Sequence, residues 1–304
     1  MSPAARTSSH RRITELLNGD FMARLDALDV FSRKIFRGRL QGERRSKRRG
    51  AGVEFADHRP YVSGDDLRFV DWNIYGRLDQ LFLKLFLEEQ DLTVSVMVDV
   101  SGSVAGGRPP KDLFLKRLAA ALAYVAMVNN NRVTLTAFAD GVAAQLPNMR
   151  GRNYLHRMAD LLLSIESAGA SDFDKACRQV TARRAGAGVM LVLSDFLFKG
   201  GYESGLRRLI SRQYDLYAIQ VLSPQELEPD LAGDLRLVDI EDADVTEVTI
   251  SSALLKYYKR NLAAYCNELK GFCSRRGAIY ALTNSGESAE SLVLNYLRRR
   301  GLLK

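Results

Sequence analysis

The sequence predicts an α/β fold, in which a doubly wound, mostly parallel sheet carries helices on both faces and follows a helical and irregular N-terminal extension. Strand and helix patterns alternate along the chain from residue 93 onward, as in proteins whose helices cover a parallel sheet. Two strand segments, 93–99 and 187–196, carry apolar residues at positions that would face both sides of a sheet. Such runs are typical of central strands that helices cover on both faces.

The N-terminal extension is expected to comprise residues 1–78. Apolar residues at helical spacing over 12–36 predict two short helices with a break near Gly19. The segment 37–49 follows, with seven cations and one acidic residue. From there to residue 78 the chain shows little periodicity, so we expect an irregular but structured collar.

The α/β domain is expected to comprise residues 79–304. It begins at 81–88, where alternating leucines predict a strand with two unlike faces. The acidic segment 223–251 is expected to form an insertion that projects as a hairpin. The other elements are, in order, the strand 93–99, a helix over 112–128, a strand hairpin that turns near Asp140-Gly141, helices over 152–164 and from about 172, the strand 187–196, a helix at 202–212, the strand 215–222, a long amphipathic helix around 255–272, the strand 278–283 and a last helix.

Composition and charge restrict the class of protein. A chain of 304 residues with 46% hydrophobic residues can bury a sizeable core. The formal net charge of +8 and the pI near 9.4 favour acidic partner surfaces. The three cysteines form no C-x-x-C pair, which argues against a disulfide framework and a zinc site. Neither a signal-peptide core nor a long apolar run occurs, so we expect a cytoplasmic protein.

Oxygen-bearing side chains follow the two central strands, at the point where each strand ends. Asp99, Ser101 and Ser103 follow the first strand, Asp195 follows the second, and Ser171 lies on a loop that opens a helix between them. Doubly wound sheets bind ligands outside the carboxyl ends of their strands, where the strand order reverses. Two carboxylates and several hydroxyls without His or Cys suit Mg²⁺ or Mn²⁺. Because hydroxyls bring no charge, we expect the ion to attract a carboxylate from a partner protein.

The stretches "DVSGS", "GAS" and "SD" resemble the metal-ion-dependent adhesion site of von Willebrand factor A-like domains. That site reads D-x-S-x-S, then a Gly-Gly-Thr-like loop, then Asp. In this sequence Ser171 replaces the usual threonine but keeps the hydroxyl, and Ala170 replaces the second glycine. The metal ligands that the resemblance implies are Asp99, Ser101, Ser103, Ser171 and Asp195.

The stretch "EFADHRPYVSGDDLRFVDW", followed by "LFLKLFLEE", resembles the signature of the bacterial family catalogued as domain of unknown function 58. The likeness extends over roughly residues 35–285. Members of that family resemble partners of MoxR-type AAA+ ATPases that help to assemble or activate other proteins, so the resemblance implies such an ATPase as partner. The positions that fit the family pattern are Arg59, Tyr61, Gly64, Asp65, Asp66, Arg68, Asp71 and Trp72.

The charged residues of the collar permit two interpretations. A mixture of Arg and Asp buries well only when it is paired, which favours a structural network in which the three aspartates pair with the two arginines. In the other interpretation the collar is a contact surface for the ATPase. The residues concerned are Arg59, Asp65, Asp66, Arg68, Asp71 and Trp72.

The basic segment 37–49 also has two interpretations. A charge run is usually a solvated face, but an excess of cations also suits the phosphates of nucleic acid or of an anionic membrane. The segment contains no aromatic residue, which argues against stacking on single-stranded bases. The candidate phosphate-binding residues are Arg44, Arg45, Lys47, Arg48 and Arg49.

Enzyme motifs are missing from the sequence. It contains neither a G-x-x-x-x-G-K-[ST] phosphate loop nor a G-x-S-x-G nucleophile elbow. Ser101 stands where a phosphatase with an aspartyl nucleophile has a second aspartate. The leading hypothesis is therefore a non-catalytic, metal-dependent protein-interaction module. The alternatives are phosphate or membrane binding through 37–49 and a metal-dependent phosphohydrolase.

Overall fold

The computed structural model describes residues 13–30, 53–88, 92–182, 188–211, 214–231, 233–238 and 245–303. The chain forms two compact units. The larger unit combines Met1–Gln41 with Leu92–Lys304, and the smaller unit is Gly42–Asp91. The basic segment 37–49, with its candidate phosphate-binding residues, lies outside the described residues.

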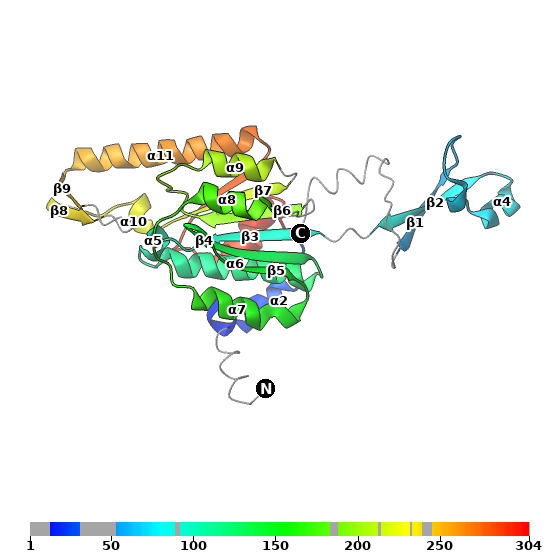
Figure 1. Ribbon diagram of the computed structural model, residues 1–304, viewed down its shortest axis with the longest axis horizontal. Helices are drawn as coiled ribbons and strands as arrows, with labels where there is room; N and C mark the ends of the chain where they lie inside the picture. The colour runs from blue at the N-terminus through cyan, green and yellow to red at the C-terminus, as the bar shows by residue number, and fades with distance from the viewer. Residues whose placement is uncertain are drawn as a thin grey trace, which may run out of the picture. The chain divides into compact units, whose positions relative to one another are not determined.

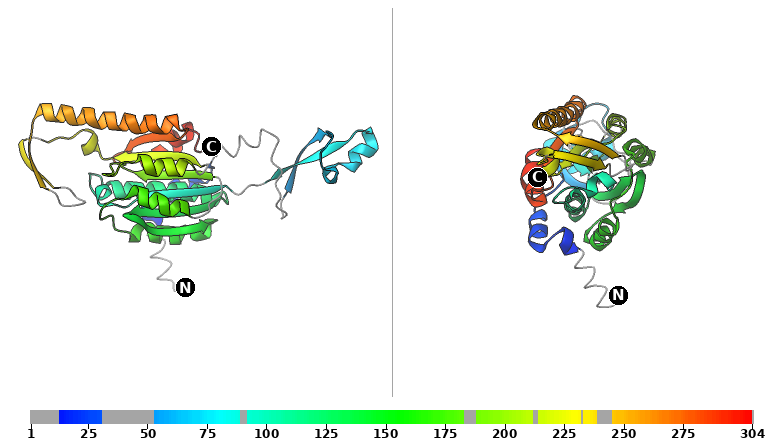
Figure 2. Two further views of the ribbon diagram at one scale, coloured as in Figure 1. Left: turned by 45° about the horizontal axis from the view of Figure 1, so that its top comes forward. Right: turned by 90° about the vertical axis from the view of Figure 1, so that its left-hand side faces the viewer.

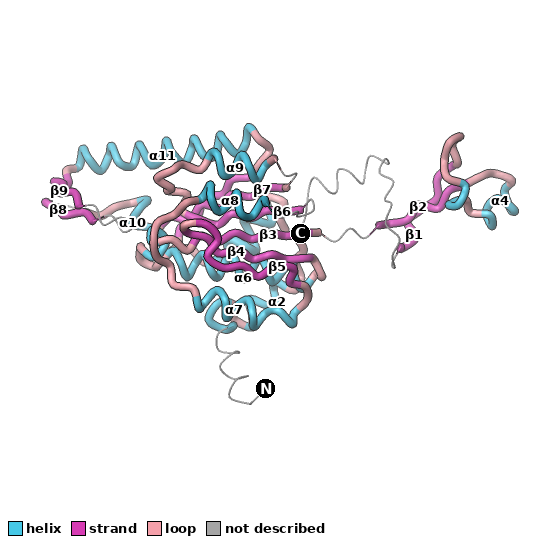
Figure 3. Tube along the Cα trace, viewed as in Figure 1, coloured by secondary structure: helices cyan, strands magenta, loops and turns pink. Residues whose placement is uncertain are grey.

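A six-stranded sheet forms the centre of the larger unit (Figure 1; Figure 3). The strand order is β10-β7-β6-β3-β4-β5, and every neighbouring pair is parallel except β4 and β5. This topology confirms the predicted doubly wound, mostly parallel sheet. The strands are β3 (Thr93–Asp99), β4 (Arg132–Ala139), β5 (Gly141–Met149), β6 (Gly188–Ser194), β7 (Asp215–Leu222) and β10 (Ile279–Asn284).

The central strands are buried on both faces because their side chains alternate between two hydrophobic cores. In β3, Val96 and Val98 belong to one core and Met97 belongs to the other. In β6, Leu191 and Val192 likewise belong to opposite cores. This period of two explains why both strands read as continuous apolar runs in the sequence.

Helices cover both faces of the sheet (Figure 2). On one face lie α2 (Gly19–Leu25), α6 (Lys111–Val128) and α7 (Leu155–Ser164). On the other face lie α8 (Phe173–Ala182), α9 (Glu203–Ile210) and α11 (Ser252–Arg275). In the described ranges, no helix combines the length and the apolar character needed to cross a membrane.

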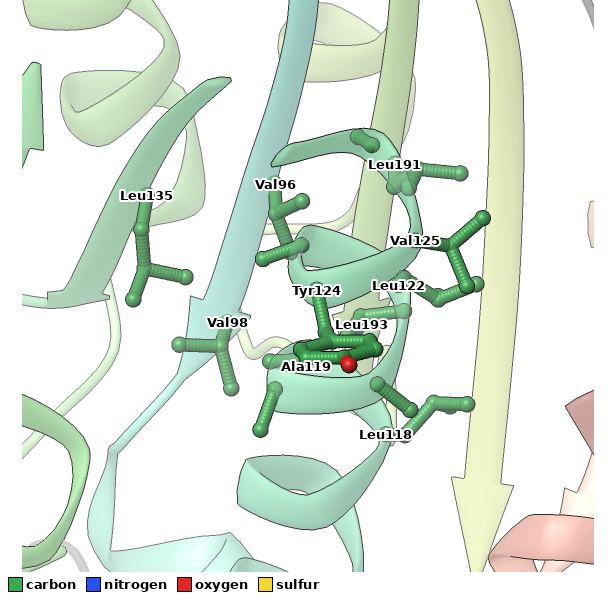
Figure 4. Close-up of a cluster of buried hydrophobic side chains, with 14 of the residues drawn as sticks. Val96, Val98, Leu118, Ala119, Leu122, Tyr124, Val125, Leu135, Leu191 and Leu193 are labelled. Atoms are coloured by element: carbon green, nitrogen blue, oxygen red, sulfur yellow. The ribbon is translucent and has the colours of Figure 1, made fainter. Parts of the chain in front are cut away.

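Helix α6 is enclosed on nearly all sides. Its inner residues Leu122 and Val125 pack near the β3 and β6 side chains (Figure 4). Its outer side meets the N-terminal arm, where the Tyr124 hydroxyl donates a hydrogen bond to the Asp26 carboxylate at 2.6 Å. The arm and α7 therefore bury residues that would otherwise face water.

The N-terminal arm, residues 13–30, packs into the core of the larger unit. Leu17 and Leu25 are buried there, and Val30 pairs with Leu303 in an isolated antiparallel bridge. The predicted interruption of the helix is present, because Asn18 caps α2. The arm thus belongs to the larger unit, whereas the collar belongs to the smaller unit. This division differs from the domain boundary that we expected at residue 78.

The smaller unit is built on an antiparallel pair of strands, β1 (Val53–Pro60) and β2 (Phe82–Glu88). Between them in the chain lie η1 (Leu67–Phe69) and α4 (Trp72–Leu78). The strand predicted at 81–88 is present, but it pairs with residues that we expected to be irregular and does not join the six-stranded sheet. Alternation of residue types identifies a strand without identifying its partner.

The acidic insertion contains the expected hairpin, formed by β8 (Gly233–Val238) and β9 (Val245–Ile250). The short helix α10 (Pro224–Leu227) precedes the hairpin, and α11 returns the chain toward β10 (Figure 1). The hairpin and α5 (Gly102–Ala105) both lie toward the carboxyl ends of β3 and β6. The chain then ends in α12 (Ala289–Ser291) and the π-helical η3 (Leu292–Leu297).

Candidate metal centre

The strand order reverses between β3 and β6. From β3 the chain builds β4 and β5 on one side, and from β6 it builds β7 and β10 on the other side. The two strands pair in register up to Val98 and Leu193, so Asp99 comes level with Ser194, and Asp195 is the next residue after Ser194. This is the switch point at which doubly wound sheets bind ligands.

Asp99 is a buried carboxylate with a partner on each oxygen. Its Oδ1 accepts a hydrogen bond from the Ser101 backbone N–H at 2.9 Å, and its Oδ2 accepts one from the Ser194 hydroxyl at 2.6 Å. Burial, together with the negative charge of Asp195, raises the pKa of the Asp99 carboxyl group to about 7, although these hydrogen bonds oppose the shift. The site therefore favours a positive charge near Asp99.

Ser194 is a site residue that sequence reasoning missed. It precedes Asp195, and its position in the register next to Asp99 follows from the pairing of Val98 with Leu193. A hydroxyl at the end of the second buried strand was the available signal. It became useful only once the two strands were known to be neighbours.

Ser101 and Ser103 place their hydroxyls at the start of α5. The two Oγ atoms lie 3.1 Å apart. Ser101 occupies the cap position of α5, but its side chain caps no backbone N–H. Ser101 is fully buried and Ser103 is partly exposed. The two hydroxyls thus form a pair that leads from the buried carboxylate toward the surface.

Hydrogen bonds hold the loop that carries Ser171 against the end of β3. Gly102 donates from its backbone N–H to the carbonyl of Gly169 at 2.8 Å, and Ala168 donates to the carbonyl of Val100 at 3.1 Å. The Ser171 Oγ is buried and has no hydrogen-bond partner among the described residues. Because buried polar atoms in native proteins are normally satisfied, this hydroxyl fits a ligand from outside the chain.

Asp195 is fully buried, and the protein engages both of its oxygens. Its Oδ1 accepts a hydrogen bond from the Leu197 N–H at 3.1 Å, and its Oδ2 accepts one from Lys111 Nζ at 2.9 Å. The same ammonium group donates to Glu226 Oε1 at 2.5 Å. Burial alone would lower the pKa of Lys111, but the charges of Asp195 and Glu226 outweigh this effect and raise it.

Lys111 and Glu226 were also missed by sequence reasoning. One signal existed for the lysine, because Lys111 begins α6, where the helix dipole disfavours a cation. Such a residue suggests an acidic partner elsewhere in the chain. Nothing in the sequence identified that partner, since Asp195 and Glu226 are 84 and 115 residues away.

The residues present fit a hard divalent cation. Asp99 and Asp195 supply charge, and Ser101, Ser103 and Ser171 supply neutral oxygens, as Mg²⁺ and Mn²⁺ prefer. In the described part of the chain no cluster of three or more His, Cys, Asp or Glu residues forms a rival site. The five residues predicted from the sequence are therefore the ones that would hold the ion.

Most of the centre is buried. Asp99, Ser101 and Asp195 are each at most 1% exposed, whereas Ser103 and Ser171 are partly exposed. A cavity of about 390 Å³ beside the first turn of α6 is not lined by any of these five residues. Ser103 and Ser171 are therefore the residues of the centre that lie nearest to the surface.

The collar residues form a separate network inside the smaller unit. Arg59 pairs with Asp65 through two hydrogen bonds of 2.7 and 2.8 Å, and Arg68 pairs with Asp66. Contrary to the expected pairing, Asp71 pairs with no arginine among the described residues; it lies 3.0 Å from His58 and 3.3 Å from Lys84. Trp72 is 60% exposed. The pairing agrees with the structural interpretation, and the role of the collar as a partner surface stays a prediction.

Comparisons with known proteins identify relatives and solved structures to which the chain is similar. The chain is 27% identical over 261 residues to the uncharacterized proteins Mb1516 of Mycobacterium bovis and Rv1480 of Mycobacterium tuberculosis, covering 82% of each chain. Among solved structures it is similar to the conserved hypothetical protein BatB from Bacteroides thetaiotaomicron, with 16% identity, 68% of this chain and 98% of that chain covered, and a TM-score of 0.43. It is also similar to a von Willebrand factor type A protein from Catenulispora acidiphila, with 10% identity, 72% and 43% coverage, and a TM-score of 0.42.

A family model described as "Protein of unknown function DUF58" matches residues 57–267. The matched region begins in β1 of the smaller unit and ends within α11 of the larger unit. It thus includes all five residues of the candidate metal centre and the whole collar network. Because the match covers more than half of the chain, the protein belongs to the DUF58 family.

Proposed function

We propose that this protein is a non-catalytic interaction module that binds a partner protein through a divalent cation. Asp99, Ser101, Ser103, Ser171 and Asp195 hold Mg²⁺ or Mn²⁺, and a carboxylate of the partner completes the coordination. The observation that carries the proposal is the convergence at the switch point of two carboxylates with a buried Ser171 hydroxyl that has no partner. The ion supplies the positive charge that the partner's carboxylate binds.

The groups around the centre support binding rather than catalysis. A serine nucleophile needs an adjacent base, and the one lysine at the centre, Lys111, is held as a cation between Asp195 and Glu226. Asp99 and Asp195 both accept hydrogen bonds within the protein. These hydrogen bonds hold both carboxylates in position as ligands for the proposed ion.

The partner that we propose is a MoxR-type AAA+ ATPase. This assignment comes from the family resemblance, and the acidic group that the ion needs is the feature by which the ATPase would be recognised. Family membership supports the resemblance. The collar, with its exposed Trp72, is proposed as a second surface for the same partner.

A pulldown tests the proposal directly. The full chain is immobilised and exposed to a purified MoxR-type ATPase from the same organism, in Mg²⁺ or in EDTA. We expect capture in Mg²⁺ only, and loss of capture by Asp99→Ala. The matched control is Asp230→Ala, which removes an exposed carboxylate outside the centre.

Two results would count against the proposal. Capture that is equal in EDTA and in Mg²⁺ would remove the role of the ion. Turnover of a generic phosphate ester by the Mg²⁺-loaded protein, abolished by Asp195→Ala, would identify a phosphohydrolase instead.

A further inference from the structure

Lys111 is a buried cation at the candidate metal centre that the proposed function does not use. Its Nζ lies 2.9 Å from Asp195 Oδ2 and 2.5 Å from Glu226 Oε1. The lysine side chain is 1% exposed, whereas that of Glu226 is 27% exposed. Lysine is almost never buried this fully unless it is paired. The pairing of Lys111 with Asp195 and Glu226 therefore indicates an electrostatic role for this lysine at the centre.

The backbone around Lys111 fixes the ammonium group in place. The loop before α6 approaches α10 so closely that a Cβ on Gly107 would lie 2.6 Å from the Ser223 Cβ. Arg108 and Gln225 exchange two hydrogen bonds, at 2.9 Å from the backbone N–H of the arginine and at 2.8 Å to its carbonyl oxygen. These contacts hold the first turn of α6 and keep the ammonium group at the centre.

The charges at the centre determine how this ammonium group affects a bound cation. Asp99 and Asp195 attract the cation with two negative charges. Lys111 places one positive charge on the same Asp195 carboxylate that the cation needs. Like charges in a buried site repel strongly, because neither water nor salt screens them well.

Glu226 offsets part of this repulsion. It accepts a hydrogen bond from Lys111, and its other oxygen accepts one from the Ser223 backbone N–H at 2.6 Å as part of a capping box. Its negative charge therefore partly neutralises the ammonium group of Lys111 and weakens the repulsion between that group and a cation at the centre. The two residues act on the centre in opposite directions.

We propose that Lys111 keeps the affinity of the metal centre for divalent cations low in the chain alone, and that Glu226 moderates this effect. The inference rests on the proposed function, since it concerns the same cation. A partner's carboxylate adds the negative charge that Lys111 cancels, so the cation and the partner bind together more tightly than either binds alone. Lys111 is a positioning residue for the charge balance of the centre and contacts no reacting atom.

The test is calorimetric titration of the full chain with MgCl₂, comparing wild type with Lys111→Gln. Glutamine removes the charge but keeps an N–H donor for Asp195, so a change of affinity reports the charge. We expect Lys111→Gln to bind Mg²⁺ roughly ten- to a hundredfold more tightly. The matched control is Lys116→Gln: Lys116 is also buried on α6, but it donates to the Ile165 carbonyl at 2.7 Å. This control should leave the affinity unchanged.

A second variant changes the affinity in the opposite direction. Glu226→Gln retains a side chain that can form the capping box. It removes the negative charge that pairs with the Lys111 ammonium group. We expect it to weaken Mg²⁺ binding by about tenfold. Because Glu226 is partly exposed, this variant also decides the matter if Lys111→Gln does not fold.

The outcomes separate this inference from the proposed function. Tighter binding by Lys111→Gln with weaker binding by Glu226→Gln supports the inference. If wild type binds Mg²⁺, Asp99→Ala does not, and Lys111→Gln binds equally or more weakly, the role of Lys111 is wrong and the proposed function stands. If neither wild type nor Lys111→Gln binds Mg²⁺, both are wrong. Thermal unfolding in EDTA and in Mg²⁺ provides a second readout of the same affinities.

Discussion

Asp99 lies in the core of the larger unit, next to the end of β6, where a second carboxylate follows. Asp99 and Asp195 are each at most 1% exposed to solvent. Two buried carboxylates repel each other, and the ionised form of each is costly unless a cation lies nearby. Lys111 relieves Asp195, whereas Asp99 has only hydrogen bonds from neutral groups. The metal-free protein therefore stores electrostatic strain at Asp99.

This strain predicts how the stability of the metal-free protein depends on pH. The pKa of Asp99 is about 7 in the folded protein against an ordinary value of 3.8. A raised pKa contributes stability that is fully present below about pH 4 and is lost as the pH rises through about 7. Asp99→Asn should remove this loss and be more stable than wild type by a few kcal/mol at about pH 8.

Denaturant unfolding in EDTA, at about pH 5 and about pH 8, measures the effect. The control is Asp230→Asn, which changes an exposed carboxylate and should follow wild type. An equal loss of stability in Asp99→Asn and in wild type would show that another group causes the pH dependence.

At the residue scale, the sequence predicted the five candidate ligands because they occur in short local patterns. Asp99, Ser101 and Ser103 fall within five positions of the chain. The partners that tune these ligands could not be found in this way. Lys111 reaches Asp195 across 84 residues, and only the folded sheet brings the two together.

At the element scale, α6 is the helix on which the core of the larger unit depends. Its residues from Phe114 to Met127 are buried except Arg117, and Lys111 at its start belongs to the metal centre. The helix thus connects the packing of the core with the position of the site. Its burial on the outer side could not be predicted from the sequence, because the covering arm lies about a hundred residues earlier in the chain.

Truncation of a core residue on α6 should therefore be costly. Leu118 is completely buried and belongs to the hydrophobic core on one face of the sheet (Figure 4). We expect Leu118→Ala to lower the free energy of unfolding by about 2–5 kcal/mol, because it removes apolar contacts and leaves a cavity. The control Leu231→Ala changes a residue that is 45% exposed and should have an effect of under about 0.5 kcal/mol. A Leu118→Ala effect as small as that of the control would mean that the helix does not pack as described.

At the scale of the whole molecule, the two units of the chain can be followed by different spectroscopic signals. Trp72 is the only tryptophan of the chain, and it lies in the smaller unit. Asp71 caps the helix that begins with Trp72, accepting a hydrogen bond from the Asn73 backbone N–H at 2.9 Å. Tryptophan fluorescence therefore follows the smaller unit, whereas circular dichroism follows mainly the helices of the larger unit.

This reporter tests the collar network. A hydrogen bond from His58, with further hydrogen bonds from backbone N–H groups and Lys84, lowers the pKa of Asp71 to about 2, although burial opposes the shift. A lowered carboxyl pKa contributes stability that is present above the ordinary value of 3.8 and is lost as the pH falls through about 2. We expect the Trp72 emission to change between about pH 4 and about pH 2.

Asp71→Asn serves as the comparison for this titration. It should alter the Trp72 emission already at neutral pH and reduce the acid-dependent change. An Asp71→Asn protein with the emission and the acid titration of wild type would show that Asp71 does not stabilise the start of α4.

The fold class and the family followed from the sequence, but the boundary between the units did not. Doubly buried strands and alternating helices are local patterns, and they identified the sheet. The strand at 82–88 showed an equally clear local pattern, yet its partner is β1 and not the sheet. Pairing between strands is a property of the whole molecule, which explains why the expected boundary at residue 78 lies inside the smaller unit.

The central claim is that the five oxygen-bearing residues bind a divalent cation, and a titration of the full chain with Mn²⁺ followed by electron paramagnetic resonance tests it most directly. The account predicts one bound ion per chain, lost in Asp99→Ala and weakened in Ser171→Ala, with Asp230→Ala unchanged. Failure of both the wild-type and the Lys111→Gln protein to bind Mn²⁺, or binding by Asp99→Ala equal to that of wild type, would contradict the account.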